Sequence, residues 1–126
     1  MLDEQITEKI LAACFDVINE LGIGFLESVY EKALVIALRD RGLSVATQRP
    51  VPVYFRGQNV GEFYPDLIVE EKIVLELKAV KSLAPEHLAQ VINYLRGTRL
   101  QTALLINFGK QKLEYRRLFN KVERLY

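Results

Sequence analysis

The sequence is short of the side chains that several classes of functional site require. Its 126 residues include a single cysteine, Cys14, and a single histidine, His87. One cysteine has no partner for an intramolecular disulfide, which favours a reducing compartment. Cys14 and His87 together do not provide the Cys/His spacing of a zinc site. Cys14 lies on the apolar stripe of a predicted helix, so we expect it in the core. Phosphate-binding loops, dinucleotide-binding glycine patterns and a Ser-His-Asp arrangement are also missing.

Long hydrophobic runs are missing as well. No stretch reaches the roughly 18 apolar residues that cross a bilayer. The acidic start of the chain does not have the charged-then-apolar order of a signal peptide. Half of the residues are hydrophobic and 26% are charged, which is an ordinary globular composition at the length of one domain. We therefore expect a soluble cytoplasmic protein with a single domain over residues 1–126.

Positive and negative charges nearly balance, with a formal net charge of +1, but they are unevenly distributed. Residues 1–63 hold six basic and nine acidic side chains, a net of −3, and residues 64–126 hold eleven and seven, a net of +4. The basic segment 96–126 can meet phosphate groups, or it can be an ordinary solvated surface. An isoelectric point near 7.8 argues against tight non-specific binding of nucleic acid.

Hydrophobic periodicity divides the chain into helices and strands. Helical spacing ends at Gly22 and again at Gly42, and a third helical segment begins at Pro85 and ends at Gly97. Helices are expected over residues 6–21, 26–41 and 85–96, and strands over residues 50–55, 60–64, 65–69, 73–78, 102–107 and 113–119. The order α-α-β-β-β-β-α-β-β predicts an α/β (α+β) fold with a central mixed β-sheet flanked by helices.

The expected strand at residues 73–78 contains two charged side chains, Glu76 and Lys78, among apolar neighbours. Charges are costly to bury unless they are paired or bind a metal. If the polar turn before this strand centres on Glu71, then Asp66 lies directly opposite Glu76, and Lys78 shares their face. The prediction depends on the register, because a slip of one residue would turn these side chains to opposite faces.

Two carboxylates held across a strand pair repel each other, so one pKa rises unless a cation lies between them. Oxygen ligands on a rigid sheet suit Mg²⁺ or Mn²⁺, which lower the pKa of bound water and neutralise charge on a phosphoryl group. Lys78 would orient or deprotonate the attacking water, or steady the phosphate. The alternative is a surface ion pair between Lys78 and Glu76 or Asp66, because a lysine beside two carboxylates is a weak pattern by itself.

Three motifs resemble those of a known family. The Pro-Asp pair at residues 65–66 and the Glu-Leu-Lys triplet at 76–78 resemble the PD-(D/E)xK motif of the restriction-endonuclease-like nuclease superfamily. Residues 90–94, QVINY, resemble the QxxxY motif of the RecB-type exonuclease branch. Residues 24–30, GFLESVY, match the signature of the GxxExxY protein family, an uncharacterised branch. The resemblance extends over almost the whole chain and implies a restriction-endonuclease-like core.

The resemblance also implies a role for each matching acidic and basic residue. Asp66 and Glu76 would be metal ligands, and Lys78 would be the catalytic lysine. Glu27 would be the additional acidic residue that reaches the metal directly or through water. For Glu27 the alternative is a solvent-facing carboxylate on a helix.

The remaining polar candidates lie on helices. Gln90 and Tyr94 are four residues apart and share a helix face, and the resemblance implies that they support the lysine and the DNA end. Their alternative is a packed helix face with Tyr94 half-buried. Tyr30 is expected in the core or behind the site. His87 either contacts phosphate or metal or is simply an exposed histidine on a helix.

The leading functional hypothesis is a metal-dependent nuclease that hydrolyses phosphodiester bonds in nucleic acid, DNA in preference to RNA, by a metal-activated water. It would be a Mg²⁺- or Mn²⁺-dependent phosphodiesterase. Two alternatives stay open. One is a non-catalytic nucleic-acid- or protein-binding module on the same fold, which the near-neutral charge and small size favour. The other is a small junction-resolvase-like endonuclease acting as a homodimer. No membrane partner is expected.

Overall fold

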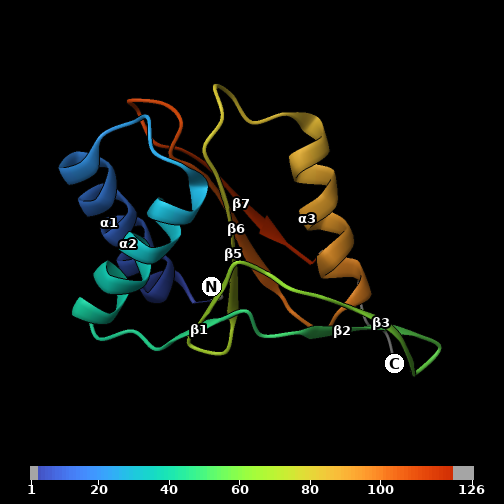
Figure 1. Ribbon diagram of the computed structural model, residues 1–126. Coiled ribbons are helices and arrows are strands. Elements are labelled where there is room, and N and C mark those ends of the chain that lie inside the picture. Colours follow the sequence, from blue (N-terminus) through green and yellow to red (C-terminus); the bar gives the residue numbers. More distant parts are fainter. Residues whose placement is uncertain (1–2, 121–126) are drawn as a thin grey trace.

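The computed structural model describes residues 3–120, in which two helices come first and a third follows five strands (Figure 1). The helices are α1 (Glu4–Leu21), α2 (Glu27–Asp40) and α3 (Pro85–Gly97). The strands are β1 (Val45–Thr47), β2 (Val51–Phe55), β3 (Gln58–Phe63), β4 (Leu67–Val69), β5 (Ile73–Lys78), β6 (Thr102–Asn107) and β7 (Glu114–Phe119). The region before α3 thus has one strand more than the sequence predicts, because Val45–Thr47 forms a short strand of its own.

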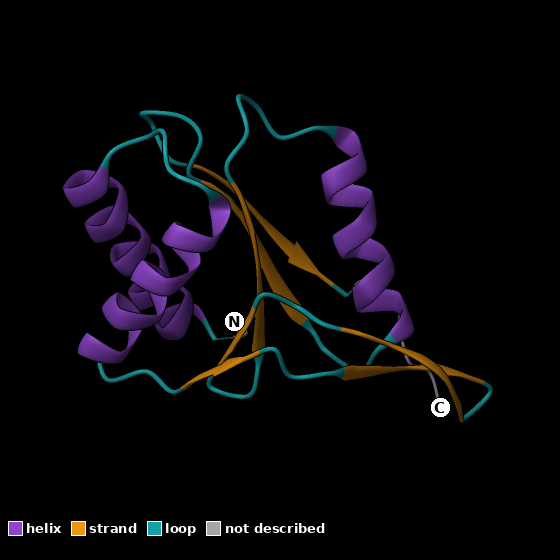
Figure 2. Cartoon of the chain, viewed as in Figure 1, coloured by secondary structure: helices purple, strands orange, loops and turns teal. Residues whose placement is uncertain are grey.

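Five of the strands form one mixed sheet in the order β1-β4-β5-β6-β7. Figure 2 shows the strands of this sheet with helices on either side. β5 and β6 run parallel, because α3 connects them as a crossover, and the other neighbours are antiparallel. β6 is buried along its whole length, as expected for an apolar strand covered on both faces. The predicted fold class, a central mixed sheet flanked by helices, is confirmed.

Helices cover both faces of this sheet, and alternate residues of β5 divide between two cores. Leu75 and Leu77 belong to the larger core, which lies under α1 and α2. Val74 points the other way and packs in a smaller core with Val91 and Leu95 of α3. The chain is therefore built in three layers, and β5 is covered on both sides.

The strands β2 and β3 depart from the predicted arrangement. They pair with each other in a two-stranded hairpin apart from the main sheet, extending past the C-terminal end of α3 (Figure 1). Gln48 has a φ of 53° and Pro50 has no N–H to donate, so the chain is interrupted between β1 and β2. The hairpin turn consists of Arg56 and Gly57, with φ values of 50° and 77°. Such a two-residue turn lets β3 begin earlier than predicted.

Two predictions about the body of the protein can be compared with the structure. No helix within residues 3–120 is long and apolar enough to cross a membrane. Cys14 is a free, fully buried thiol, and burial raises its pKa well above the ordinary range. It packs as a small apolar side chain, as predicted.

Candidate active site

The hairpin formed by β4 and β5 brings Asp66 and Glu76 together. Leu67 pairs with Leu75 in antiparallel register, so Asp66, one residue earlier, lies beside Glu76. The backbone N–H of Leu77 donates a hydrogen bond of 2.7 Å to Asp66 Oδ2. The register on which the sequence argument depended is confirmed.

The turn that sets this register is held from outside the hairpin. Glu70 and Glu71 both have left-handed φ values, 54° and 58°, which two-residue hairpin turns usually obtain from glycine or asparagine. The carboxylate of Glu70 accepts hydrogen bonds of 2.7 Å from the backbone N–H and from the hydroxyl of Ser44. These bonds lower the pKa of Glu70. Glu71 forms an ion pair with Arg49, so both turn residues are tied to the segment around β1.

Glu76 is the most unusual carboxylate of the site. It is 8% exposed, and its Oε1 is buried without a hydrogen-bond partner among residues 3–120. Burial, followed by the negative charge of Asp66, raises the pKa of Glu76 from 4.5 to about 8. Burial also raises the pKa of Asp66, although the Leu77 N–H and the charge of Lys78 oppose this. Near neutral pH the pair therefore favours holding a proton or a cation.

Lys78 ends β5 on the same face as Glu76. Its positive charge lowers the pKa of Glu76, Asp66 and Glu27, so the ammonium lies within electrostatic reach of all three carboxylates. Lys78 takes part in none of the ion pairs found within the described chain. Glu76 is also buried, so the alternative of a solvent-exposed ion pair on an open sheet face is wrong.

α3 presents Gln90 and Tyr94 to this face of the sheet. Gln90 Nε2 donates a hydrogen bond of 2.7 Å to Tyr94 Oη. The Tyr94 ring stacks on Phe63, with 3.9 Å between the ring centroids. Loss of solvation, and then the negative charge of Glu76, raises the pKa of Tyr94. The shared helix face predicted from the spacing is thus directed at the carboxylates.

The connection between α1 and α2 positions Glu27 at the start of α2. Tyr30, one turn later, is fully buried and stacks on Phe108 with 4.9 Å between ring centroids. Its hydroxyl donates to the carbonyl of Gly22 at 2.6 Å and accepts from the N–H of Phe25 at 3.3 Å. Tyr30 is therefore a core residue, as predicted, and the structure adds that its hydroxyl anchors the loop leading to Glu27.

Glu27 itself is exposed and lies close to the other charged groups of the site. Loss of solvation and the charge of Asp66 raise its pKa, while Lys78 and His87 lower it. His87 is half-buried, and its Nδ1 accepts a hydrogen bond of 2.9 Å from the N–H of Ala84. In the neutral ring the proton is then on Nε2. His87 is thus a helix-start residue near Glu27 rather than a freely exposed side chain.

Sequence reasoning missed a further carboxylate, Glu31. It lies one turn after Glu27 on α2, and this spacing was the signal that could have revealed it. Loss of solvation, then the charges of Asp66 and Glu27, raises its pKa. Glu31 lines a surface hollow together with Gln48, Tyr64 and Asp66. The acidic part of the site therefore extends along α2.

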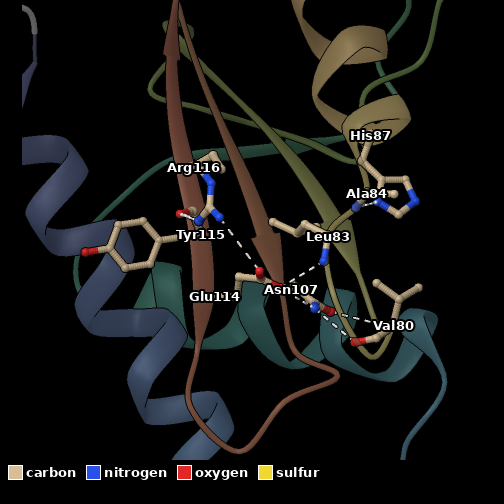
Figure 3. A network of polar contacts seen from close by, with 8 residues as sticks. All are labelled: Val80, Leu83, Ala84, His87, Asn107, Glu114, Tyr115 and Arg116. Carbon is tan, nitrogen blue, oxygen red and sulfur yellow. Dashed lines mark hydrogen bonds and ion pairs between the residues drawn. The ribbon is translucent and has the colours of Figure 1, made fainter.

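A network of hydrogen bonds around the buried Asn107 holds the segment that follows Lys78 (Figure 3). Asn107, fully buried and paired with Lys78 across β5 and β6, accepts from the N–H and donates to the carbonyl of Val80, both at 2.9 Å. Its Nδ2 also donates to Glu114 Oε1 at 3.0 Å, and the same oxygen accepts from the N–H of Leu83 at 3.0 Å. These hydrogen bonds fix the backbone of the segment that directly follows the catalytic candidate Lys78.

The donor set of the site suits a divalent cation that keeps several water ligands. Oε1 of Glu76 is available, and the backbone bond of Asp66 uses Oδ2. Mg²⁺ is commonly bound by one or two carboxylates and waters. Within residues 3–120, no three histidine, cysteine, aspartate or glutamate side chains converge into a complete metal site. Glu27 lies near the pair, within electrostatic reach of Asp66.

Searches of curated proteins and of solved structures found no match. The sequence model of a protein family matches residues 4–118, a span that contains every candidate site residue from Glu27 to Tyr94. This match covers nearly the whole chain. The protein therefore belongs to the PD-(D/E)XK nuclease superfamily.

Proposed function

We propose that this protein is a nuclease that uses Mg²⁺ or Mn²⁺ to hydrolyse phosphodiester bonds in nucleic acid, DNA in preference to RNA. The observation that carries the proposal is the buried, unpartnered Oε1 of Glu76 beside Asp66. Two carboxylates with raised pKa values are an unfavourable arrangement in the absence of a cation. A metal-binding role accounts for their position, and the superfamily supports nucleic acid as the substrate.

Asp66 and Glu76 would hold the metal ion in this proposal. A metal ion held there would lower the pKa of a bound water and would neutralise charge that develops on the phosphoryl group. The ammonium of Lys78 orients the attacking water or stabilises the phosphate oxygens in the transition state. Asn107 and its partners keep the backbone after Lys78 in place, which limits how far the ammonium moves from the carboxylates.

Gln90, Tyr94 and Glu27 have supporting roles. The Tyr94 phenol, whose pKa is raised above its ordinary value of 10, is protonated at neutral pH and can donate a hydrogen bond to a phosphate oxygen. Its bond to Gln90 and its stacking on Phe63 fix the ring. Glu27, which is within electrostatic reach of Asp66, would bind the metal directly or through a coordinated water.

Cleavage assays with the chain of residues 1–126 test the proposal. Labelled single-stranded, duplex and branched DNA and RNA are incubated with Mn²⁺ or Mg²⁺, and EDTA is the blank. Glu76→Gln keeps the shape of the side chain but removes its charge. We expect it to lower the cleavage rate by more than about 100-fold, the upper end for groups that only support metal ligands. Glu8→Gln, the same change at an exposed position of α1, is the matched control and should cleave at the wild-type rate.

Calorimetric titration with Mn²⁺ completes this test. Metal-dependent cleavage and metal binding that are both lost in Glu76→Gln, but kept in Glu8→Gln, would support the proposal. Absence of both cleavage and metal binding in the wild-type protein would contradict it. A non-catalytic binding module would then be the better description.

A further inference from the structure

The β2–β3 hairpin and the C-terminal end of α3 form a surface that the proposed chemistry does not use. We call it the arm surface, and it consists of Tyr54, Phe55, Arg56, Arg96 and Arg99. These side chains line one hollow between the hairpin and the helix end. The Phe55 ring is 60% exposed and the Tyr54 ring 39% exposed. Large aromatic side chains in such positions add little to folding and are available for binding.

The hairpin is attached to α3 by a different residue. Val53 packs so closely on Gly97 that a Cβ at the glycine would lie 2.8 Å from Val53 Cγ1. The hairpin register shifts between Val53 and Tyr54, which marks a bulge directly after this contact. Val53 thus anchors the hairpin on α3, and the exposed Phe55 ring takes no part in that contact.

The charge of the arm surface is positive and unbalanced. Arg56, Arg96 and Arg99 form no ion pair with any carboxylate among residues 3–120. The guanidinium carbon of Arg99 lies 5.1 Å from the centroid of the Tyr54 ring. That of Arg56 lies 4.9 Å from the centroid of Phe55. Arginines ordered against aromatic faces can pair with phosphates while the rings stack on bases.

The arm surface is connected to the candidate active site. β3 leads from the hairpin turn to Phe63, whose ring stacks on Tyr94, and the chain then continues to Asp66. Along α3, Gly97 lies about 10 Å beyond Gln90 at ~1.5 Å per residue. That distance corresponds to about three nucleotides at the ~3.4 Å spacing of a duplex strand. A strand held at the site can therefore reach the arm.

We propose that the arm surface binds the single-stranded nucleic acid that flanks the scissile bond. The arginines contact phosphates, and Phe55 and Tyr54 act as stacking platforms for bases. The inference rests on the proposed function for the choice of nucleic acid. A single strand is specified because its unpaired bases can leave the stack and lie against exposed rings, which bases inside a duplex cannot do.

The test is a binding assay in EDTA, so that no cleavage occurs. Fluorescence anisotropy is measured with a short labelled oligothymidylate, with a duplex of the same length and with labelled heparin, over a range of salt concentrations. Phe55→Ala should weaken oligothymidylate binding about 10-fold, a typical effect of losing one stacking ring. It should leave heparin, which has no bases, nearly unchanged. Its effect on the duplex should also be small.

The charged part of the surface is tested by the double variant Arg56→Gln with Arg99→Gln. If the variant loses two phosphate contacts with a single strand, the slope of the logarithm of the association constant against the logarithm of the salt concentration should become shallower by about 1.4. The matched control removes two positive charges from the helical layer on the other side of the protein, Lys9→Gln with Arg39→Gln (Figure 1). The control should keep the wild-type affinity and slope. Circular dichroism and thermal unfolding check that each variant is folded.

The outcomes separate this inference from the proposed function. Oligothymidylate binding that depends on the arm supports the inference even if the wild-type protein cleaves nothing. If the wild-type protein cleaves nucleic acid but the arm substitutions leave its affinity for oligothymidylate unchanged, the inference is overturned and the proposed function is not. Equal losses in the control variant, or equal effects of Phe55→Ala on heparin and oligothymidylate, also overturn it. So would a dimer in sedimentation experiments that binds no nucleic acid and dissociates in Phe55→Ala, because the arm would then join two copies of the chain.

Discussion

The two faces of β5 differ sharply although their residues alternate along one short strand. Under α1 and α2, Leu75 and Leu77 are fully buried in an apolar core. Under α3, Val74 is followed by Glu76 and Lys78, and the pKa of Glu76 is raised to about 8. The first face contributes hydrophobic stabilisation, and the second holds charges that oppose folding. The well-packed face thus gives β5 the rigidity with which its other face can hold two carboxylates that repel each other.

Removing a side chain from the apolar face should have the largest effect on stability. We expect Leu75→Ala to lower the free energy of unfolding by about 2 to 5 kcal/mol, because it leaves a cavity in a fully buried position. Its neighbour on the other face provides the contrast, since Glu76→Gln should leave the protein at neutral pH as stable as the wild type or more so. Urea unfolding in EDTA measures both. Equal destabilisation by the two substitutions would show that Glu76 is a structural residue.

Titrating the charged face should have the next largest effect. Because the folded pKa of Glu76, about 8, lies above its ordinary 4.5, the folded protein binds its proton more tightly than the unfolded chain does. The metal-free protein should therefore lose stability as the pH rises from about 4.5 to about 8. Relaxation and water entry limit the loss to on the order of 2 kcal/mol.

Unfolding of the metal-free protein at pH 5 and pH 8 checks the sign. Glu76→Gln should flatten the decline, and Asp66, whose pKa is also raised, leaves a smaller decline of the same sign. Glu70 and Glu114 have lowered pKa values, so their contribution to stability is lost as the pH falls. That loss occurs only at more acidic pH than this experiment uses. A wild-type protein that gains stability between pH 5 and pH 8 in EDTA would show that the carboxylate of Glu76 is already compensated.

The contrast between the faces of β5 could be predicted from the sequence because it depends on local spacing. A short polar turn between two apolar segments fixed the register, and the register placed Asp66 beside Glu76. The four-residue spacing of Gln90 and Tyr94 likewise predicted their common face, and the two side chains are hydrogen-bonded. Tyr30 was expected in the core or behind the site because it follows Glu27 by three residues and can stack below it.

Features that depend on contacts distant in the sequence could not be predicted in this way. The hairpin of β2 and β3 leaves the sheet because it packs on the end of α3 at Gly97, far along the chain. Asn107 lies at the end of an apolar strand, and its role appears only when the segment around Val80 folds back onto it. Glu31 had the right spacing from Glu27, but only the fold places α2 next to Asp66.

The smallest effect on stability and cleavage is expected at Tyr30, which packs in the apolar core and holds the loop that leads to the site. Tyr30→Phe removes the hydroxyl that binds the Gly22 carbonyl at 2.6 Å but keeps the ring stacked on Phe108. We expect a loss of about 1 kcal/mol in the free energy of unfolding, the usual contribution of one hydrogen bond. Cleavage should fall by a few-fold, because the loop that positions Glu27 becomes less fixed. Tyr115→Phe, the same change at an exposed position of β7, should alter neither property. If Tyr30→Phe abolished cleavage without lowering stability, the hydroxyl would act in the reaction itself. The apolar side of the sheet would then contribute to the chemistry as well as to stability.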